Sequence, residues 1–91
     1  MDNYEQILHS LYCMLGERFG VVFDTATDYA NIPIRYCFDN TNTLNCLYFL
    51  LEIASRYNIM PSNRMMENCM TWSLNEYALE ILKNKHNDFK E

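Results

Sequence analysis

The stretch from Asn42 to Tyr57, NTLNCLYFLLEIASRY, constrains the fold of this chain more than any other. At about 100° per residue, most of its apolar residues fall on one broad arc, which is typical of a helix with a wide buried face. This arc holds Leu44, Cys46, Leu47, Leu50, Leu51, Ile53, Ala54 and Tyr57. The stretch therefore predicts a central helix around which a small all-α domain packs.

The opposite side of this helix is polar but carries two aromatic residues. Asn45 and Glu52 lie on the polar arc, and Tyr48 and Phe49 lie at its edges. Because exposed apolar groups on a solvated face tend to mark interaction sites, these four residues are predicted to bind a protein partner. The alternative, that the preceding loop folds over Tyr48 and Phe49, stays open.

Two methionines extend this candidate surface. Met65 and Met66 belong to a short helix expected near the same end of the bundle, and Met-rich surfaces adapt to varied partners. Methionine at helical spacing is also common core filler, so both interpretations are kept.

Capping residues predict three further helices. The first runs from Asn3 to Phe19, with Asn3 or Asp2 as its cap and Gly20 at its end. A short helix follows Pro61 and spans residues 63–70. The last follows the capping box from Ser73 to Glu76, flanked by Trp72 and Tyr77 as a hydrophobic staple. Gly16, inside the first helix, is expected to mark the close approach of another segment.

The stretch from Val21 to Thr41 shows no helical period. Its apolar side chains predict a long ordered loop that is pinned to the core. The chain of 91 residues is expected to form one domain over residues 1–86, with residues 87–91 as a frayed tail.

Charge and hydropathy narrow the classes of function. A net charge of −5 and the lack of a basic cluster argue against nucleic acid as a partner. The chain has neither a signal-peptide pattern nor the roughly 20 apolar residues that span a bilayer, so a cytoplasmic protein without membrane contact is expected. Its four cysteines are then expected to be reduced thiols.

Residues capable of catalysis or metal binding occur without a recognisable motif. His9 and His86 are far apart in the sequence and lack ligands at metal-site spacing. The cysteines have no nucleophile motif around them, and the aspartates at 24, 28 and 39 do not match a calcium loop. The chain is therefore predicted to be no enzyme, with no metal and no cofactor.

Four segments together resemble the acyl carrier protein family. These are the end of the first helix from Leu15 to Val21, the start of the central helix at Thr43-Leu44 with its apolar pattern, the Met60-Pro61 step, and the run from Ser73 to Ile81. The resemblance implies a four-helix bundle with a long ordered loop between its first and second helices.

The resemblance also points to a degenerate member. The family carries phosphopantetheine on the serine of an Asp-Ser-Leu motif, where this chain has Asn42-Thr43-Leu44. Thr43 thus aligns with the phosphopantetheine serine, but its extra methyl group crowds the transfer reaction and the preceding carboxylate is missing. The acidic contacts of the family's second helix are likewise replaced by one Glu, one Arg and two aromatics.

These features favour a non-catalytic interaction module without phosphopantetheine. The chain is similar to acyl-carrier-related proteins of bacterial peptide-maturation systems, which implies a peptide-modifying enzyme or a precursor peptide as its partner. Two alternatives remain open: a working acyl or peptidyl carrier that uses Thr43 as its phosphopantetheine anchor, and an unrelated small helical regulator.

Overall fold

The computed structural model describes residues 3–38 and 44–87, with side chains up to residue 84 of the last helix. Within these residues the chain forms helices and no strand, which confirms the all-α prediction. The elements are α1 (Tyr4–Phe19), two short 3-10 helices η1 (Tyr29–Asn31) and η2 (Ile34–Cys37), α2 (Leu44–Tyr57), α3 (Asn63–Glu67) and α4 (Leu74–Asn87). The last four residues of the expected tail lie outside this description.

The first helix begins and ends where its capping residues predict. The Asn3 side chain accepts a hydrogen bond from the backbone N–H of Gln6 (2.9 Å), and the Gln6 side chain accepts one from the Asn3 N–H (3.0 Å). Gly20 ends the helix with φ 69°, a left-handed conformation that glycine adopts without a steric penalty.

The start of α4 confirms the predicted capping box. The Glu76 carboxylate accepts from the Ser73 N–H (2.9 Å), and the Ser73 hydroxyl accepts from the Glu76 N–H (3.3 Å). The rings of Trp72 and Tyr77 pack edge to face at 5.6 Å as the hydrophobic staple. These contacts fix the direction in which the chain enters α4.

The third helix is shorter than expected, because it ends at Glu67 and not at residue 70. Its cap is Ser62, whose hydroxyl accepts from the Met65 N–H (3.2 Å). At the other end, the backbone and side-chain amides of Asn68 both donate to the Arg64 carbonyl (3.1 and 2.9 Å). The backbone leaves helical geometry at Asn68 (φ −111°, ψ 15°), and an asparagine side chain that bonds a nearby backbone group is favoured at such helix ends.

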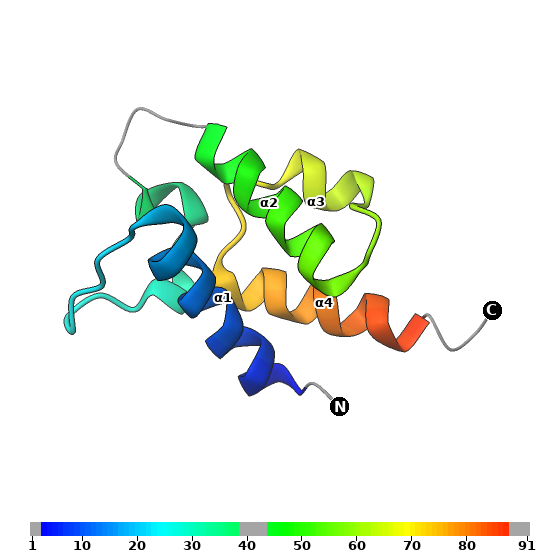
Figure 1. Cartoon of the computed structure of the whole chain (residues 1–91), viewed down its shortest axis with the longest axis horizontal. Helices are drawn as coiled ribbons and strands as arrows, with labels where there is room; N and C mark the ends of the chain where they lie inside the picture. The colour runs from blue at the N-terminus through cyan, green and yellow to red at the C-terminus, as the bar shows by residue number, and fades with distance from the viewer. Residues whose placement is uncertain (1–2, 39–43, 88–91) are drawn as a thin grey trace.

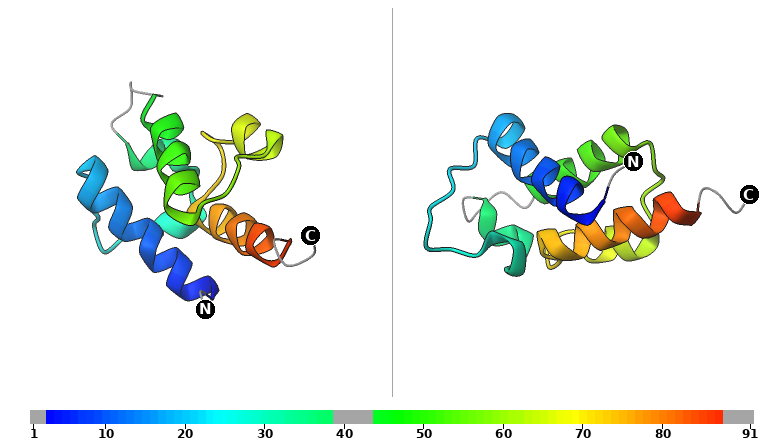
Figure 2. Two further views of the ribbon diagram at one scale, coloured as in Figure 1. Left: turned by 45° about the vertical axis from the view of Figure 1, so that its right-hand side comes forward. Right: turned by 90° about the horizontal axis from the view of Figure 1, so that it is seen from below.

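The helices form an open bundle (Figures 1 and 2). The most extensive packing is between α1 and α4; α2 packs on both α1 and α3. Phe49 of α2 lies at the centre, with ring centroids 5.9 Å from Phe19 of α1, 6.5 Å from Phe38 of the loop and 5.5 Å from Tyr77 of α4. One aromatic cluster therefore joins three of the four α-helices and the loop.

The loop between α1 and α2 is anchored to the segment that precedes α4. The N–H of Ile34 donates to the Trp72 carbonyl (2.8 Å), and the N–H of Arg35 donates to the Met70 carbonyl (3.1 Å). Within the loop, Tyr29, Ile34, Cys37 and Phe38 are buried against the bundle. Ile34 and Cys37 belong to η2, so this part of the loop forms a 3-10 turn.

Candidate functional site

Two apolar stripes run along opposite sides of α2. The buried stripe follows the spacing i, i+3, i+4, i+7 and consists of Cys46, Phe49, Leu50 and Ile53, each at most 1% exposed. A second stripe with the same spacing faces solvent: Leu44 (54% exposed), Leu47 (41%), Tyr48 (52%) and Leu51 (50%). We call this second set the α2 stripe. The two stripes are centred about 160° apart around the helix axis.

The predicted orientation of this helix was therefore right for Cys46, Leu50 and Ile53 and wrong for three leucines. Of the two alternatives kept for the aromatics, burial under the loop holds for Phe49 and exposure holds for Tyr48. Phe49 was expected at the edge of a solvated face but is fully buried, whereas Leu44, Leu47 and Leu51 were expected in the core but are exposed. The buried face is rotated by about 70° from the centre of the predicted arc. The physical reason is the ring of Phe49, which fills the space between α1, the loop and α4.

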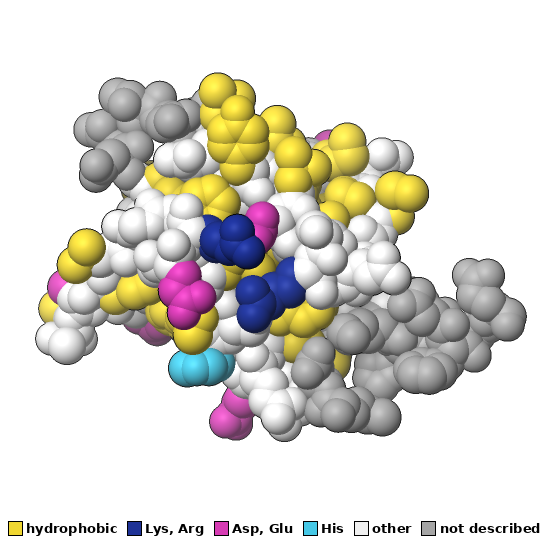
Figure 3. Space-filling view, in the orientation of Figure 1, with side chains coloured by type: hydrophobic (Ala, Val, Ile, Leu, Met, Phe, Trp, Pro, Cys, Tyr) yellow, Lys and Arg dark blue, Asp and Glu magenta, His cyan; other side chains and the backbone are white. Residues whose placement is uncertain are grey.

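For one of the two methionines of the predicted partner surface, the core-filler interpretation is the correct one. Met65 is fully buried, because it packs into the hydrophobic core as filler, and so it lies away from the surface. Met66 is 54% exposed as expected, and Met60 and Met70 are exposed with it. Figure 3 shows hydrophobic side chains gathered along one edge of the molecule, over α2 and α3.

The polar residues predicted beside the aromatics lie along the flank of α2. Asn45 and Glu52 are half-buried, and the Glu52 carboxylate forms an ion pair with the Arg18 guanidinium of α1 (N–O 3.4 Å). An exposed pair of this kind contributes at most about 1 kcal/mol to stability. It neutralises the charge next to the α2 stripe. Thr43, the predicted phosphopantetheine position, lies outside the described residues.

The leucines of the α2 stripe are exposed residues that sequence reasoning placed in the core. Their signal was present, because residues 44, 47, 48 and 51 form a complete helical repeat of their own beside the repeat 46, 49, 50 and 53. Merging both repeats into one wide arc concealed it. The structure brings Tyr48 together with these leucines and separates it from Phe49.

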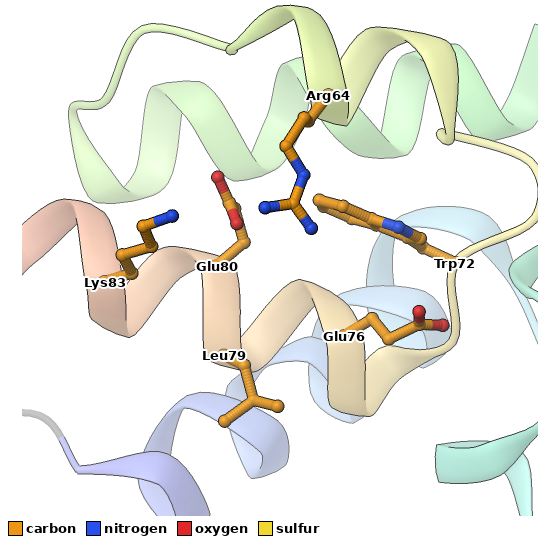
Figure 4. Close-up of a pocket in the computed structure, with 6 residues that line it drawn as sticks. All are labelled: Arg64, Trp72, Glu76, Leu79, Glu80 and Lys83. Carbon is orange, nitrogen blue, oxygen red and sulfur yellow. The ribbon is translucent and has the colours of Figure 1, made fainter.

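A shallow pocket of about 170 Å³ lies between α3 and α4 (Figure 4). The Arg64 guanidinium stands over the Trp72 ring, 5.6 Å from its centroid, and Glu80 extends toward it from α4. Glu76 and Lys83 complete the charged lining. Two cations and two carboxylates meet here, so the pocket offers no excess of either charge to a ligand.

One pair of potentially reactive groups lies on the outer side of α1. The Cys13 sulfur is 3.5 Å from Nε2 of His9, one helical turn away. His9 is exposed and Cys13 half-buried, and neither residue lines the pocket between α3 and α4. Within the described part of the chain, no group of three His, Cys, Asp or Glu residues is placed to hold a metal ion.

Comparison with protein-family models, curated proteins and solved structures finds no match for this chain. Among the described helices, none is long and apolar enough to cross a membrane. The α2 stripe is thus the feature of the described surface that most clearly points to a function.

Proposed function

We propose that this chain is a non-catalytic interaction module that docks a protein partner on the α2 stripe. The observation that carries this proposal is the half-exposure of Leu44, Leu47, Tyr48 and Leu51 on one side of a helix whose other side is already buried. A helix that is apolar on opposite sides is typical of one with neighbours on both.

The composition of the stripe favours apolar docking over ionic docking. It contains three leucines and one tyrosine, and the nearest carboxylate on its flank, that of Glu52, is paired with Arg18. Tyrosine is enriched in interface cores, where charged residues are depleted. Met66 in α3 and Met70 after it are also exposed and supply adaptable apolar contacts.

The partner in this proposal is a peptide-modifying enzyme or a precursor peptide of a bacterial peptide-maturation system. What supports this choice is the acyl-carrier-like order of elements, namely a long helix, a long loop, a second helix, a short helix and a final helix, together with the four motif segments. The replacement of serine by Thr43 supports a carrier-like protein that binds without carrying phosphopantetheine.

A site-specific cross-linking experiment tests the docking surface. A photoreactive phenylalanine analogue replaces Tyr48 in one variant and Tyr36 in a matched control, since Tyr36 is also exposed (61%) but lies on η2. On illumination in the source cell, position 48 should give a discrete cross-linked protein or peptide that mass spectrometry identifies, and position 36 should not. Equal products from both positions, or none from position 48, would contradict the proposed surface.

Intact-mass measurement tests the absence of the cofactor. Chain incubated with coenzyme A and a broad-specificity phosphopantetheinyl transferase should keep its mass, because Thr43 replaces the reactive serine. A gain of one phosphopantetheine that Thr43→Ala abolishes would instead support the rival function of a working carrier.

A further inference from the structure

We propose that, when no other partner is bound, a second copy of this chain covers the α2 stripe and forms a symmetric dimer with two antiparallel α2 helices at its centre. This inference rests on the same face as the proposed function. It differs in naming the occupant, which is the chain itself.

The register of the α2 stripe makes it self-complementary. A two-fold axis requires that the surface match itself when turned by half a rotation. If the axis passes between Leu47 and Tyr48, Leu44 of one copy faces Leu51 of the other, and Leu47 faces Tyr48. Every pair in this register is apolar, so no charge is brought against a like charge.

The charged residues of α2 are not part of the stripe, and Glu52 is the one that borders it. Glu52 and Arg56 are the charged residues among positions 44–57, and both lie in the C-terminal half of the helix. Glu52 is paired with Arg18 of its own chain, so the negative charge beside the stripe is neutralised. Antiparallel packing also sets the positive end of each helix dipole beside the negative end of the other.

The exposed apolar area is close to what a dimer needs. Besides the stripe, three methionines in and around α3 are exposed: Met60 (84%), Met66 (54%) and Met70 (38%). Figure 3 shows hydrophobic side chains gathered over α2 and α3. With about 200 Å² for a fully exposed large side chain, these seven residues present about 750 Å² per copy. A standard interface buries about 800 Å² per partner, so an interface at the small end of the specific range is expected.

Sedimentation equilibrium of the full chain under reducing conditions tests this dimer. Between about 1 µM and about 1 mM, the weight-average mass should rise from 10.9 kDa toward twice that value. Leu47→Lys should remain monomeric over the whole range, whereas the matched control Leu79→Lys, on exposed α4 surface (56%), should associate as wild type does. Circular dichroism checks that each variant is folded, and Leu51→Glu replaces Leu47→Lys if that variant is not.

A charge-complementation pair tests the antiparallel register. Leu44→Lys and Leu51→Glu should each associate at least tenfold more weakly than wild type, because each introduces a charge into an apolar contact. Mixing the two variants should restore a heterodimer, since the lysine introduced at position 44 of one copy then faces the glutamate introduced at position 51 of the other. A mixture that stays monomeric would overturn the register.

The outcomes separate this inference from the proposed function. Wild-type chain that stays at 10.9 kDa up to about 1 mM would overturn the dimer but leave the cross-linking result at position 48 intact. A dimer that Leu47→Lys leaves unchanged would overturn the assignment of the dimer to this face.

Discussion

At the scale of single residues, the two glycines of this chain have opposite roles. Gly20 adopts φ 69° and ends α1, whereas Gly16 lies inside α1 on the exposed side. A Cβ atom at Gly16 would lie 3.9 Å from both the Phe23 ring and the Val21 carbonyl oxygen, which is ordinary contact. The expectation that Gly16 marks a close approach was therefore wrong. The change in stability on replacing Gly16 is then decided by the low helix propensity of glycine alone.

Gly16→Ala should accordingly raise the free energy of unfolding by about 0.5–1 kcal/mol, because alanine costs less conformational entropy in a helix than glycine. Gly20→Ala serves as the control and should lower it by about 1 kcal/mol or more, since alanine at positive φ is strained. Urea denaturation followed by circular dichroism measures both changes. Destabilisation by Gly16→Ala would show that another segment does press on this position.

Burial changes the chemistry of Cys37. Loss of hydration on burial raises the pKa of its thiol from 9.0 to about 11, with a smaller contribution from Cys46. The folded state therefore holds this proton more tightly than the unfolded state. Stability from this group is complete below pH 9 and is lost as the pH rises toward 11.

The free energy of unfolding should thus fall between about pH 9 and 11 in wild type and fall less steeply in Cys37→Ala. Burial also raises the pKa of Tyr77, so some of the decline remains in the variant. Denaturation at a series of pH values under reducing conditions measures the two slopes. Parallel slopes would mean that Cys37 titrates in the folded protein as it does in the unfolded chain.

At the scale of elements, the sequence predicted the helix ends better than it predicted the helix faces. The caps of α1 and α4 could be predicted, because side chains within one turn satisfy the free backbone groups there. The pairs are Asn3 with Gln6 and Ser73 with Glu76. Such contacts are local, so neighbouring residues suffice to predict them. The end of α3 lies at Asn68, where the backbone leaves helical geometry, and this end was not foreseen.

Ser73→Ala should lower the free energy of unfolding by about 1 kcal/mol, because it removes the hydroxyl that accepts from the Glu76 N–H at the start of α4. Ser55→Ala, on the exposed side of α2, should change it by less than about 0.5 kcal/mol. Thermal melts of wild type, Ser73→Ala and Ser55→Ala compare the stabilities of the three proteins. Equal effects at both positions would contradict the role of the capping box.

The orientation of α2 could not be predicted locally, because apolar residues cover about three quarters of its circumference. Which part faces the core depends on the shape of the space between α1, the loop and α4. The ring of Phe49 fills that space, and its neighbours Phe19, Phe38 and Tyr77 are 11 to 30 positions away in the sequence. The loop's second 3-10 turn likewise depends on hydrogen bonds to residues 70 and 72.

At the scale of the whole molecule, the chain builds one core on one side of α2 and leaves apolar surface on the other. A domain of this size buries a limited share of its surface, and its total stability is about 5–15 kcal/mol. Leaving three leucines and a tyrosine half-exposed on one helix forgoes part of that stabilisation. This arrangement favours a protein whose α2 stripe is covered when it functions.

The most direct test of this account compares two adjacent residues of α2. Phe49→Ala should lower the free energy of unfolding by about 3–5 kcal/mol, because it leaves a cavity in the aromatic cluster. Tyr48→Ala should change it by less than about 0.5 kcal/mol, since that ring is half-exposed. Urea denaturation at low protein concentration measures both, and comparable losses from the two variants would contradict the orientation of α2 and, with it, the docking surface.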